Sequence, residues 1–101
     1  MKVVDVHSFT SVKILKDGII GIEIFLPNAP PLIVIRGRKG FIMCGYLNIN
    51  VANKLGLIAA RVAGVRSIEE MLNKEVAEVT TKAKEIGIKE GMKVKDVLEL
   101  I

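Results

Sequence analysis

The chain has 101 residues, of which half are hydrophobic and 26% are charged, with a formal net charge of +4. This length fits a single domain, because two cores of half the size would each need metals or disulfides for stability. No run approaches the roughly 18 to 20 apolar residues of a membrane-spanning helix. The N-terminus lacks the pattern of a secretory signal, and a single cysteine excludes an internal disulfide. We therefore expect one cytoplasmic domain, residues 1–101, that does not enter a membrane.

The surplus of positive charge is a weak indication of a nucleic-acid partner. After Ser67 basic and acidic residues alternate, as on solvated helix faces, and the local excess is confined to Arg36–Lys39. One Tyr, three Phe and no Trp provide little material for stacking on bases. Binding to nucleic acid is therefore not expected.

The first part of the chain alternates with a period of two residues. This alternation predicts a long or bent strand over residues 3–15. Asp17-Gly18 is a strong hairpin signal, because the turn requires positive φ angles, and the return strand runs over 19–26. The prolines of 27–31 cannot donate hydrogen bonds to a sheet, so this segment is a loop.

Two further strands are predicted over 32–36 and 41–47, with a tight turn at Gly37–Gly40 between them. Together the four strands predict an antiparallel meander or a small barrel. Ile20, Ile22 and Ile24 make one face of the return strand wholly apolar, and only Glu23 interrupts the other face.

Both faces of this sheet therefore need to be buried, and the short helices that follow provide too little apolar surface for two faces. A monomer would expose more apolar surface than soluble monomers usually carry. We expect the N-terminal β region to self-associate, as a dimer or, with two symmetry axes, a dihedral tetramer.

The second part of the chain changes to helical spacing. Asn48 and Asn50 can each cap a short helix that Gly56 ends. The small residues of 58–64 suggest a strand packed closely under a helix.

Ser67 and Glu70 form a capping box that starts a helix over 68–72. Apolar spacing predicts two more amphipathic helices, over 76–86 and 94–101. Strands first and helices afterwards predict an α+β fold, with residues 1–47 mainly β and 48–101 mainly α.

Cys44 is a candidate catalytic nucleophile beside a glycine near the end of a strand. A thiol attacks as the thiolate, so it needs a base, a cation or a helix N-terminus beside it. The helix after Asn48 could supply the last of these. His7, the single histidine, could act as the base if the first and fourth strands brought the two residues together. A buried cysteine that acts as a small hydrophobic residue is the more common case.

Two groups of basic residues are candidate binding sites for an anionic small molecule. Arg36, Arg38 and Lys39 surround a glycine-flanked turn, where amide and guanidinium donors point into the same volume. The alternative is a solvated hairpin tip. Arg61 and Arg66 flank an apolar segment and need a carboxylate, a carbonyl or a ligand as partner, with an internal ion pair as the alternative.

No known catalytic or cofactor motif is present in the sequence. Phosphate-loop, dinucleotide, zincin and nucleophile-elbow patterns are missing, and one histidine with one cysteine cannot give zinc-ligand spacing. We therefore expect neither a metal nor a cofactor.

A family resemblance covers nearly the whole chain and is most specific from Phe41 to Arg66. The residues that carry it are Gly40 to Asn48, Asn53, Gly56, Ala59, Arg61, Gly64-Val65-Arg66, Glu69, Leu72, Glu85 to Ile88 and Gly91-Met92. In these residues the chain resembles the YunC-like domain-of-unknown-function family. The resemblance implies a small bacterial or archaeal domain that forms a tetramer through its N-terminal β region. It places Cys44, Arg61 and Arg66 in a recurrent motif without assigning a reaction.

Two functions of different classes follow. The first is a homo-oligomeric structural or small-ligand-binding domain. The second is a small enzyme in which Cys44 is the nucleophile and Arg61 or Arg66 holds an anionic substrate.

Overall fold

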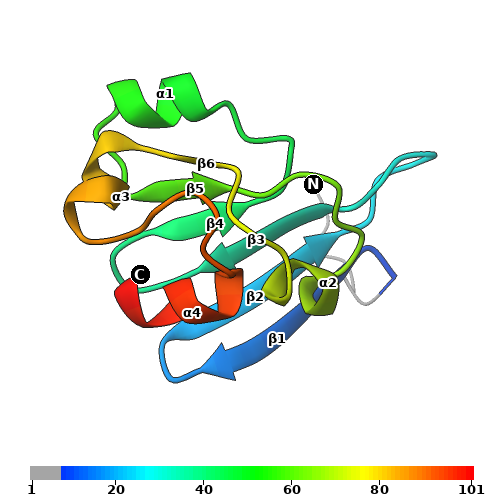
Figure 1. The fold of residues 1–101 in the computed structure, drawn as a ribbon. Helices are drawn as coiled ribbons and strands as arrows, with labels where there is room; N and C mark the ends of the chain where they lie inside the picture. The colour runs from blue at the N-terminus through cyan, green and yellow to red at the C-terminus, as the bar shows by residue number, and fades with distance from the viewer. Residues whose placement is uncertain (1–7) are drawn as a thin grey trace.

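A computed structural model describes residues 8–101, whose strands form one six-stranded sheet (Figure 1). The strands follow one another across the sheet in chain order: β1 (Thr10–Lys16), β2 (Ile19–Ile24), β3 (Leu32–Arg36), β4 (Phe41–Met43), β5 (Ala59–Arg61) and β6 (Glu78–Val79). All neighbouring pairs are antiparallel except β4 and β5, which are parallel.

Short helices pack against this sheet. They are α1 (Ile49–Lys54), α2 (Ile68–Leu72), α3 (Thr81–Glu85) and α4 (Val94–Val97), which continues into the 3-10 helix η1 (Leu98–Leu100). Helix α2 contacts β2, β3 and α4, whereas α1 and α3 both pack against β5. None of these helices in residues 8–101 has the length and apolar content needed to cross a membrane. The predicted α+β class is confirmed.

The predicted meander is present as β1 to β4, but the predicted small barrel is not. Within the described residues β1 pairs only with β2 and β6 only with β5, so the sheet stays open. The Asp17-Gly18 hairpin is confirmed, with Gly18 at a φ of 79°. The tight turn at Gly37–Gly40 is confirmed by the hydrogen bond that Gly37 N–H donates to the Gly40 carbonyl (2.8 Å).

Two strands are shorter than their sequence patterns predict. The first begins at Thr10, and the predicted part from Val3 to His7 lies outside the described residues. The fourth ends at Met43, because Leu47 N–H donates to the Cys44 carbonyl (3.1 Å) and closes a turn.

The helix predicted over 76–86 forms only in its second half, as α3, because its first part is extended and pairs with β5. The N–H groups of Ala77 and Thr80 donate to carbonyls of β5 at 2.9 and 3.0 Å. Helix α3 starts only after Thr80, whose hydroxyl accepts from Ala83 N–H (3.2 Å) and donates to the Leu57 carbonyl (2.7 Å). The β-branched residues Val76, Val79 and Thr80 fit an extended strand better than a helix.

The small-residue segment predicted as a strand under a helix is confirmed. It forms β5, whose Ala59 and Ala60 are buried at 0% and 1% exposure. Their small side chains allow α1 and α3 to lie close to the strand.

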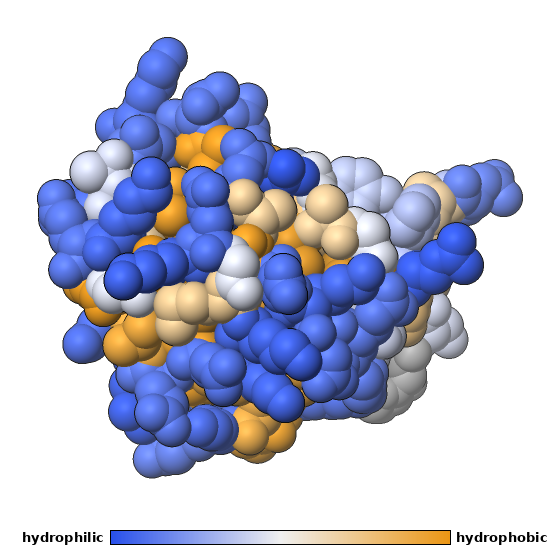
Figure 2. All heavy atoms as spheres, in the orientation of Figure 1, coloured by the Kyte–Doolittle hydropathy of each residue, from blue (hydrophilic) through white to orange (hydrophobic). Residues whose placement is uncertain are grey.

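The two faces of the sheet are covered to different extents. One face lies under α2 and contains Ile33, Ile35 and Ile42, all with no exposed surface. The opposite face, here called the open face, carries the apolar residues Val12, Ile14, Ile20, Ile22, Ile24, Leu32, Val34, Phe41 and Met43, and Arg36 lies on it opposite Ile20 and Phe41. Val12 and Ile14 are 61% and 83% exposed. By contrast, hydrophilic residues cover most of the helix-bearing side in Figure 2.

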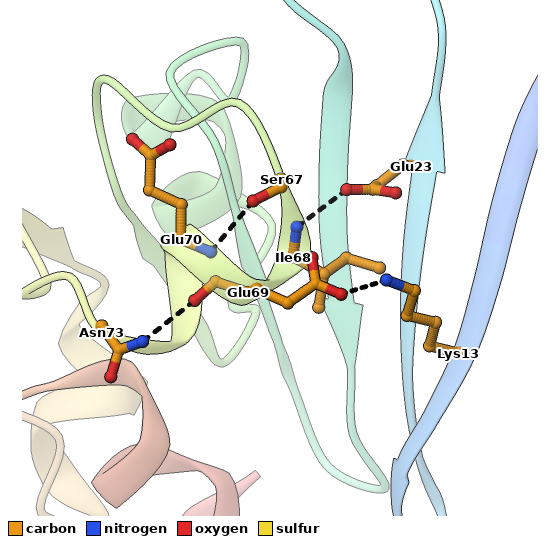
Figure 3. Close-up of polar contacts among 7 residues, drawn as sticks. All are labelled: Lys13, Glu23, Ser67, Ile68, Glu69, Glu70 and Asn73. Carbon is orange, nitrogen blue, oxygen red and sulfur yellow. Dashed lines mark hydrogen bonds and ion pairs between the residues drawn. The ribbon is translucent and has the colours of Figure 1, made fainter.

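Helix α2 is attached to the sheet through the buried carboxylate of Glu23 on β2. Glu23 Oε2 accepts a hydrogen bond from Ile68 N–H at 2.8 Å (Figure 3). Gly21 leaves room for the Ile68 side chain, because a Cβ there would lie 2.9 Å from Ile68 Cδ1. Ser67 Oγ accepts from Glu70 N–H at 3.0 Å, which confirms Ser67 as the helix cap. The position of α2 thus depends on the Glu23 carboxylate as acceptor and on the space that Gly21, which has no side chain, leaves for Ile68.

We expect Glu23→Ala to lower the free energy of unfolding by about 1–3 kcal/mol, because Ile68 N–H loses its acceptor in a buried position. Urea denaturation at pH 7 and fixed protomer concentration measures this change. Glu90→Ala, at an exposed carboxylate, is the control and should change stability by less than about 0.5 kcal/mol. Equal stability of the two variants would contradict the anchoring role of Glu23.

Lys13 on β1 forms an exposed ion pair with Glu69 on α2 (Figure 3). Their hydrogen bond raises the pKa of Lys13 above its ordinary value and lowers the pKa of Glu69 below its ordinary value. For Glu69 the resulting stabilisation is present above its unfolded pKa and is lost as pH falls through the lowered folded pKa. For Lys13 the stabilisation is present below its unfolded pKa and is lost as pH rises through its raised folded pKa.

We expect the Glu69 side chain to titrate below an ordinary glutamate in an NMR pH titration of its carboxyl carbon. Lys13→Met should move the Glu69 pKa back up, because it removes the donor while keeping the length of the side chain. Lys16→Met, on the same strand, serves as the control and should leave Glu69 unchanged. An unshifted Glu69 in the unsubstituted protein would contradict the pair.

Candidate functional site

A pocket of about 440 Å³ lies at the end of β4. Three loops form its wall: the loop before β3, the turn after β4 and the segment that leads into α2. The lining residues are Pro30, Pro31, Cys44, Gly45, Tyr46, Gly64, Val65 and Arg66.

The strand register brings these loops together. Because β4 and β5 are parallel, with Met43 opposite Arg61, the segments that follow both strands leave the sheet at the same edge. Val62 N–H donates to the Met43 carbonyl at 2.9 Å and extends this pairing. Cys44 N–H donates to the Ile33 carbonyl at 3.0 Å, which places the start of β3 beside the end of β4.

Cys44 forms part of the pocket wall but is only 3% exposed. Its Sγ accepts a hydrogen bond from Ile33 N–H at 3.3 Å. The sequence-based expectation of a mostly buried thiol is confirmed. His7, the predicted partner in a dyad, lies outside the described residues.

The structure separates the two arginines that the sequence considered together. Arg66 is exposed and lines the pocket. Arg61 is directed to Glu78 on the neighbouring strand, with Nε at 2.6 Å and Nη2 at 2.5 Å from Glu78 Oε1. Arg61 therefore has an internal ion pair, the structural alternative that the sequence left open.

The basic turn lies at the opposite end of β4, away from Cys44, where Arg38 and Lys39 line a second pocket of about 560 Å³, and several of its donors have partners within the protein. Lys39 N–H and Gly40 N–H both donate to the carbonyl of Ile101, the latter at 3.3 Å. Arg38 donates to the Asp17 carbonyl at 2.8 Å and pairs with the Asp17 carboxylate at 3.3 Å. Arg36 is exposed at the end of β3. The structure does not bring this turn and Arg66 into one site.

Sequence reasoning missed Pro30, Pro31 and Tyr46 as pocket residues. Tyr46 Oη donates to the Pro30 carbonyl at 2.9 Å and so joins two of the three loops. Two sequence features could have indicated them. A tyrosine directly after a glycine, and a pair of prolines without N–H donors, are both typical of loops. Within residues 8–101 no cluster of three or more His, Cys, Asp or Glu side chains suited to a metal comes together.

The fold and the pocket define a small α+β domain with an open, mostly antiparallel sheet and a pocket at the exit of two parallel strands. A family model described as "Domain of unknown function (DUF1805)" matches residues 43–101, and the chain belongs to this family.

Two relatives support this assignment. "Uncharacterized protein YunC" of Bacillus subtilis (strain 168) is 35% identical over 68 residues, which are 63% of this chain and 67% of the relative. The crystal structure of a protein of unknown function, TA1206 from Thermoplasma acidophilum, matches with a TM-score of 0.83 and 35% identity. That match covers 90% of this chain and 91% of the other. The resemblance to the YunC-like family is thereby confirmed.

We expect Cys44 in the folded protein to react with iodoacetamide at least about tenfold more slowly than in the urea-unfolded protein, since alkylation requires an accessible thiolate. Mass spectrometry after timed quenching at pH 8 gives both rates. Equal rates would contradict the burial of Sγ. A folded-state rate above the unfolded one would show an activated thiol and favour the enzyme.

Proposed function

We propose that this chain works in the cytoplasm as a homo-oligomeric domain that binds a small ligand in the pocket between Cys44 and Arg66. The observation that supports assembly is the open face, a mainly apolar surface on a sheet whose other face is already covered. The observation that supports ligand binding is a pocket whose volume falls in the range of small-molecule sites, roughly 300–1,000 Å³.

A second copy of the chain is the occupant that best fits the open face. Across its centre the residues in register are Val12, Ile22, Val34 and Met43, with no charge among them. An apolar centre selects a partner surface that is equally apolar and flat, and the charged residues of the open face lie outside this centre, with Arg36 at the end of β3 and the Arg61–Glu78 pair on β5 and β6. Another open face satisfies this condition, and a two-fold axis through the sheet makes the contact isologous.

A dihedral tetramer is the proposed assembly. One isologous contact through the open face gives a dimer, and a second axis through the N-terminal β region gives four copies. Ile14 on the edge strand β1 is 83% exposed, which supports a second contact along that edge.

Binding is favoured over catalysis by the composition of the pocket wall. None of its eight residues is a histidine, lysine, aspartate or glutamate that could act as a base for the Cys44 thiol. Arg66 can hold an anionic small molecule. The wall does not include the other basic residues that were predicted from the sequence to bind a ligand, which are Arg61, Arg36, Arg38 and Lys39. The alternative is a small enzyme with Cys44 as nucleophile, and the alkylation rate of Cys44 in the folded protein tests it.

We expect size-exclusion chromatography with light scattering to report a tetramer, or at least a dimer, at micromolar concentration. Ile22→Lys should lower the mass, because it places a charge at the centre of a dry apolar contact. A soluble monomer of about 11 kDa for the unsubstituted chain would contradict the proposal.

Phe25→Lys is the matched control for this experiment. Phe25 is 48% exposed and follows β2 with the same alternation as the buried Ile19 and Glu23, so it points away from the open face. The control should keep the oligomer. A folded Phe25→Lys monomer together with an oligomeric Ile22→Lys variant would assign the contact to the other side.

A further inference from the structure

The charge of the pocket comes from one side chain. Arg66 is the single Lys, Arg, Asp or Glu among the eight lining residues. Within residues 8–101 it has no carboxylate within ion-pair distance, whereas Arg61 pairs with Glu78 and Arg38 with Asp17. Among the described residues, no carboxylate therefore competes with an anion from solution for the Arg66 guanidinium.

Backbone donors lie on both sides of the pocket. In the turn after β4, the N–H groups of Gly45 and Tyr46 have no acceptor within the described residues. The same holds for the N–H groups of Gly64, Val65 and Arg66 in the segment before α2, again counting only acceptors in residues 8–101. Two lining loops thus offer several N–H groups that a ligand can satisfy.

Both glycines of the wall leave their backbone open to approach. A Cβ at Gly64 would meet nothing within 4 Å, and a Cβ at Gly45 would meet only Arg61 Nη1, at 3.8 Å. Gly64 has a φ of 73°, a conformation that other residues rarely adopt. The space beside the Cα atom of each of these glycines is therefore open, apart from the adjacent residues of the chain.

The rest of the wall is apolar. Pro30 and Pro31 have no N–H, and Val65 contributes only carbon atoms from its side chain. The hydroxyl of Tyr46 is already used by the Pro30 carbonyl, so its ring faces a ligand mainly as a hydrophobic surface. This wall suits an uncharged hydrocarbon body.

From this arrangement we infer that the pocket binds a small organic carboxylate: the carboxylate is held by the Arg66 guanidinium and free loop amides, and its hydrocarbon body lies against Pro30, Pro31 and Val65. A guanidinium matches a carboxylate with two parallel hydrogen bonds. One cation balances a monoanion, whereas a phosphate dianion would leave negative charge uncompensated. This inference rests on the proposed ligand-binding function and specifies its ligand class.

Titration of the ¹⁵N-labelled full chain, followed by amide NMR, tests this inference. The probes are 3-methylbutanoate, its neutral isostere 3-methylbutanamide, acetate and inorganic phosphate. We expect 3-methylbutanoate to shift the Gly45 and Gly64 amide resonances and to leave Gly18 and Gly91, outside the pocket wall, unchanged. Binding should be at least about tenfold tighter than for acetate, because its hydrocarbon body is also buried. The amide should cause no comparable shift.

Arg66→Gln tests the role of the cation, with Arg36→Gln as a matched control at an exposed arginine outside the pocket. Arg66→Gln should weaken 3-methylbutanoate at least about tenfold, since it loses a charge-assisted bidentate contact. The control should bind as the unsubstituted protein does. An unchanged affinity in Arg66→Gln would overturn the inference.

Other outcomes separate this inference from the proposed function. Equal shifts from the acid and the amide, or stronger binding of phosphate, would overturn the carboxylate class while leaving a ligand pocket in place. No shift of Gly45 or Gly64 by any probe would overturn the inference and remove the support for a pocket ligand. Light scattering on the same samples reports the assembly independently in every case.

Discussion

The buried hydrogen bond between the Glu23 carboxylate and Ile68 N–H determines how the two parts of the molecule meet. Glu23 lies on the covered face of β2, and its carboxylate is the acceptor that the sheet provides for the start of α2. Because the chain must pass from β5 to this fixed point within a few residues, the segment containing Gly64 and Arg66 has little freedom in where it runs. The pocket wall before α2 is therefore a consequence of how α2 is anchored on β2, although Glu23 itself does not line the pocket.

Much of the fold could be predicted because it depends on neighbours in sequence. Alternation gave the strands of the meander, Asp17-Gly18 gave the hairpin, and Ser67 gave the start of α2. The segment before Thr80 failed because its structure depends on a distant partner. Val76 and Val79 are spaced as on a helix, but pairing with β5 supplies hydrogen bonds that a local pattern cannot show. The same limit explains why β6 was missed.

The site was predictable in part for the same reason. Cys44 and Arg66 could be named from their glycine neighbours and apolar surroundings. Their proximity depends on the parallel pairing of β4 and β5, which only the assembled sheet defines. Alternation along β5 could have predicted that Arg61 points away from the buried Ala60. Because Arg61 follows Ala60 directly, its side chain lies on the opposite face of the strand, where it pairs with Glu78. Arg66, beyond the end of that strand, is free of this alternation.

The arrangement also separates the two surfaces on which the proposed function depends. Cys44 continues the alternation of the buried Ile42, and Val65 beside it is buried as well, so the pocket is built from the covered side of the sheet. The open face is carried by the intervening residues, such as Val34 and Met43. A second copy placed on the open face therefore does not need to displace a ligand from the pocket. Because alternate residues of β4 face the two surfaces, both surfaces depend on the position of this short strand.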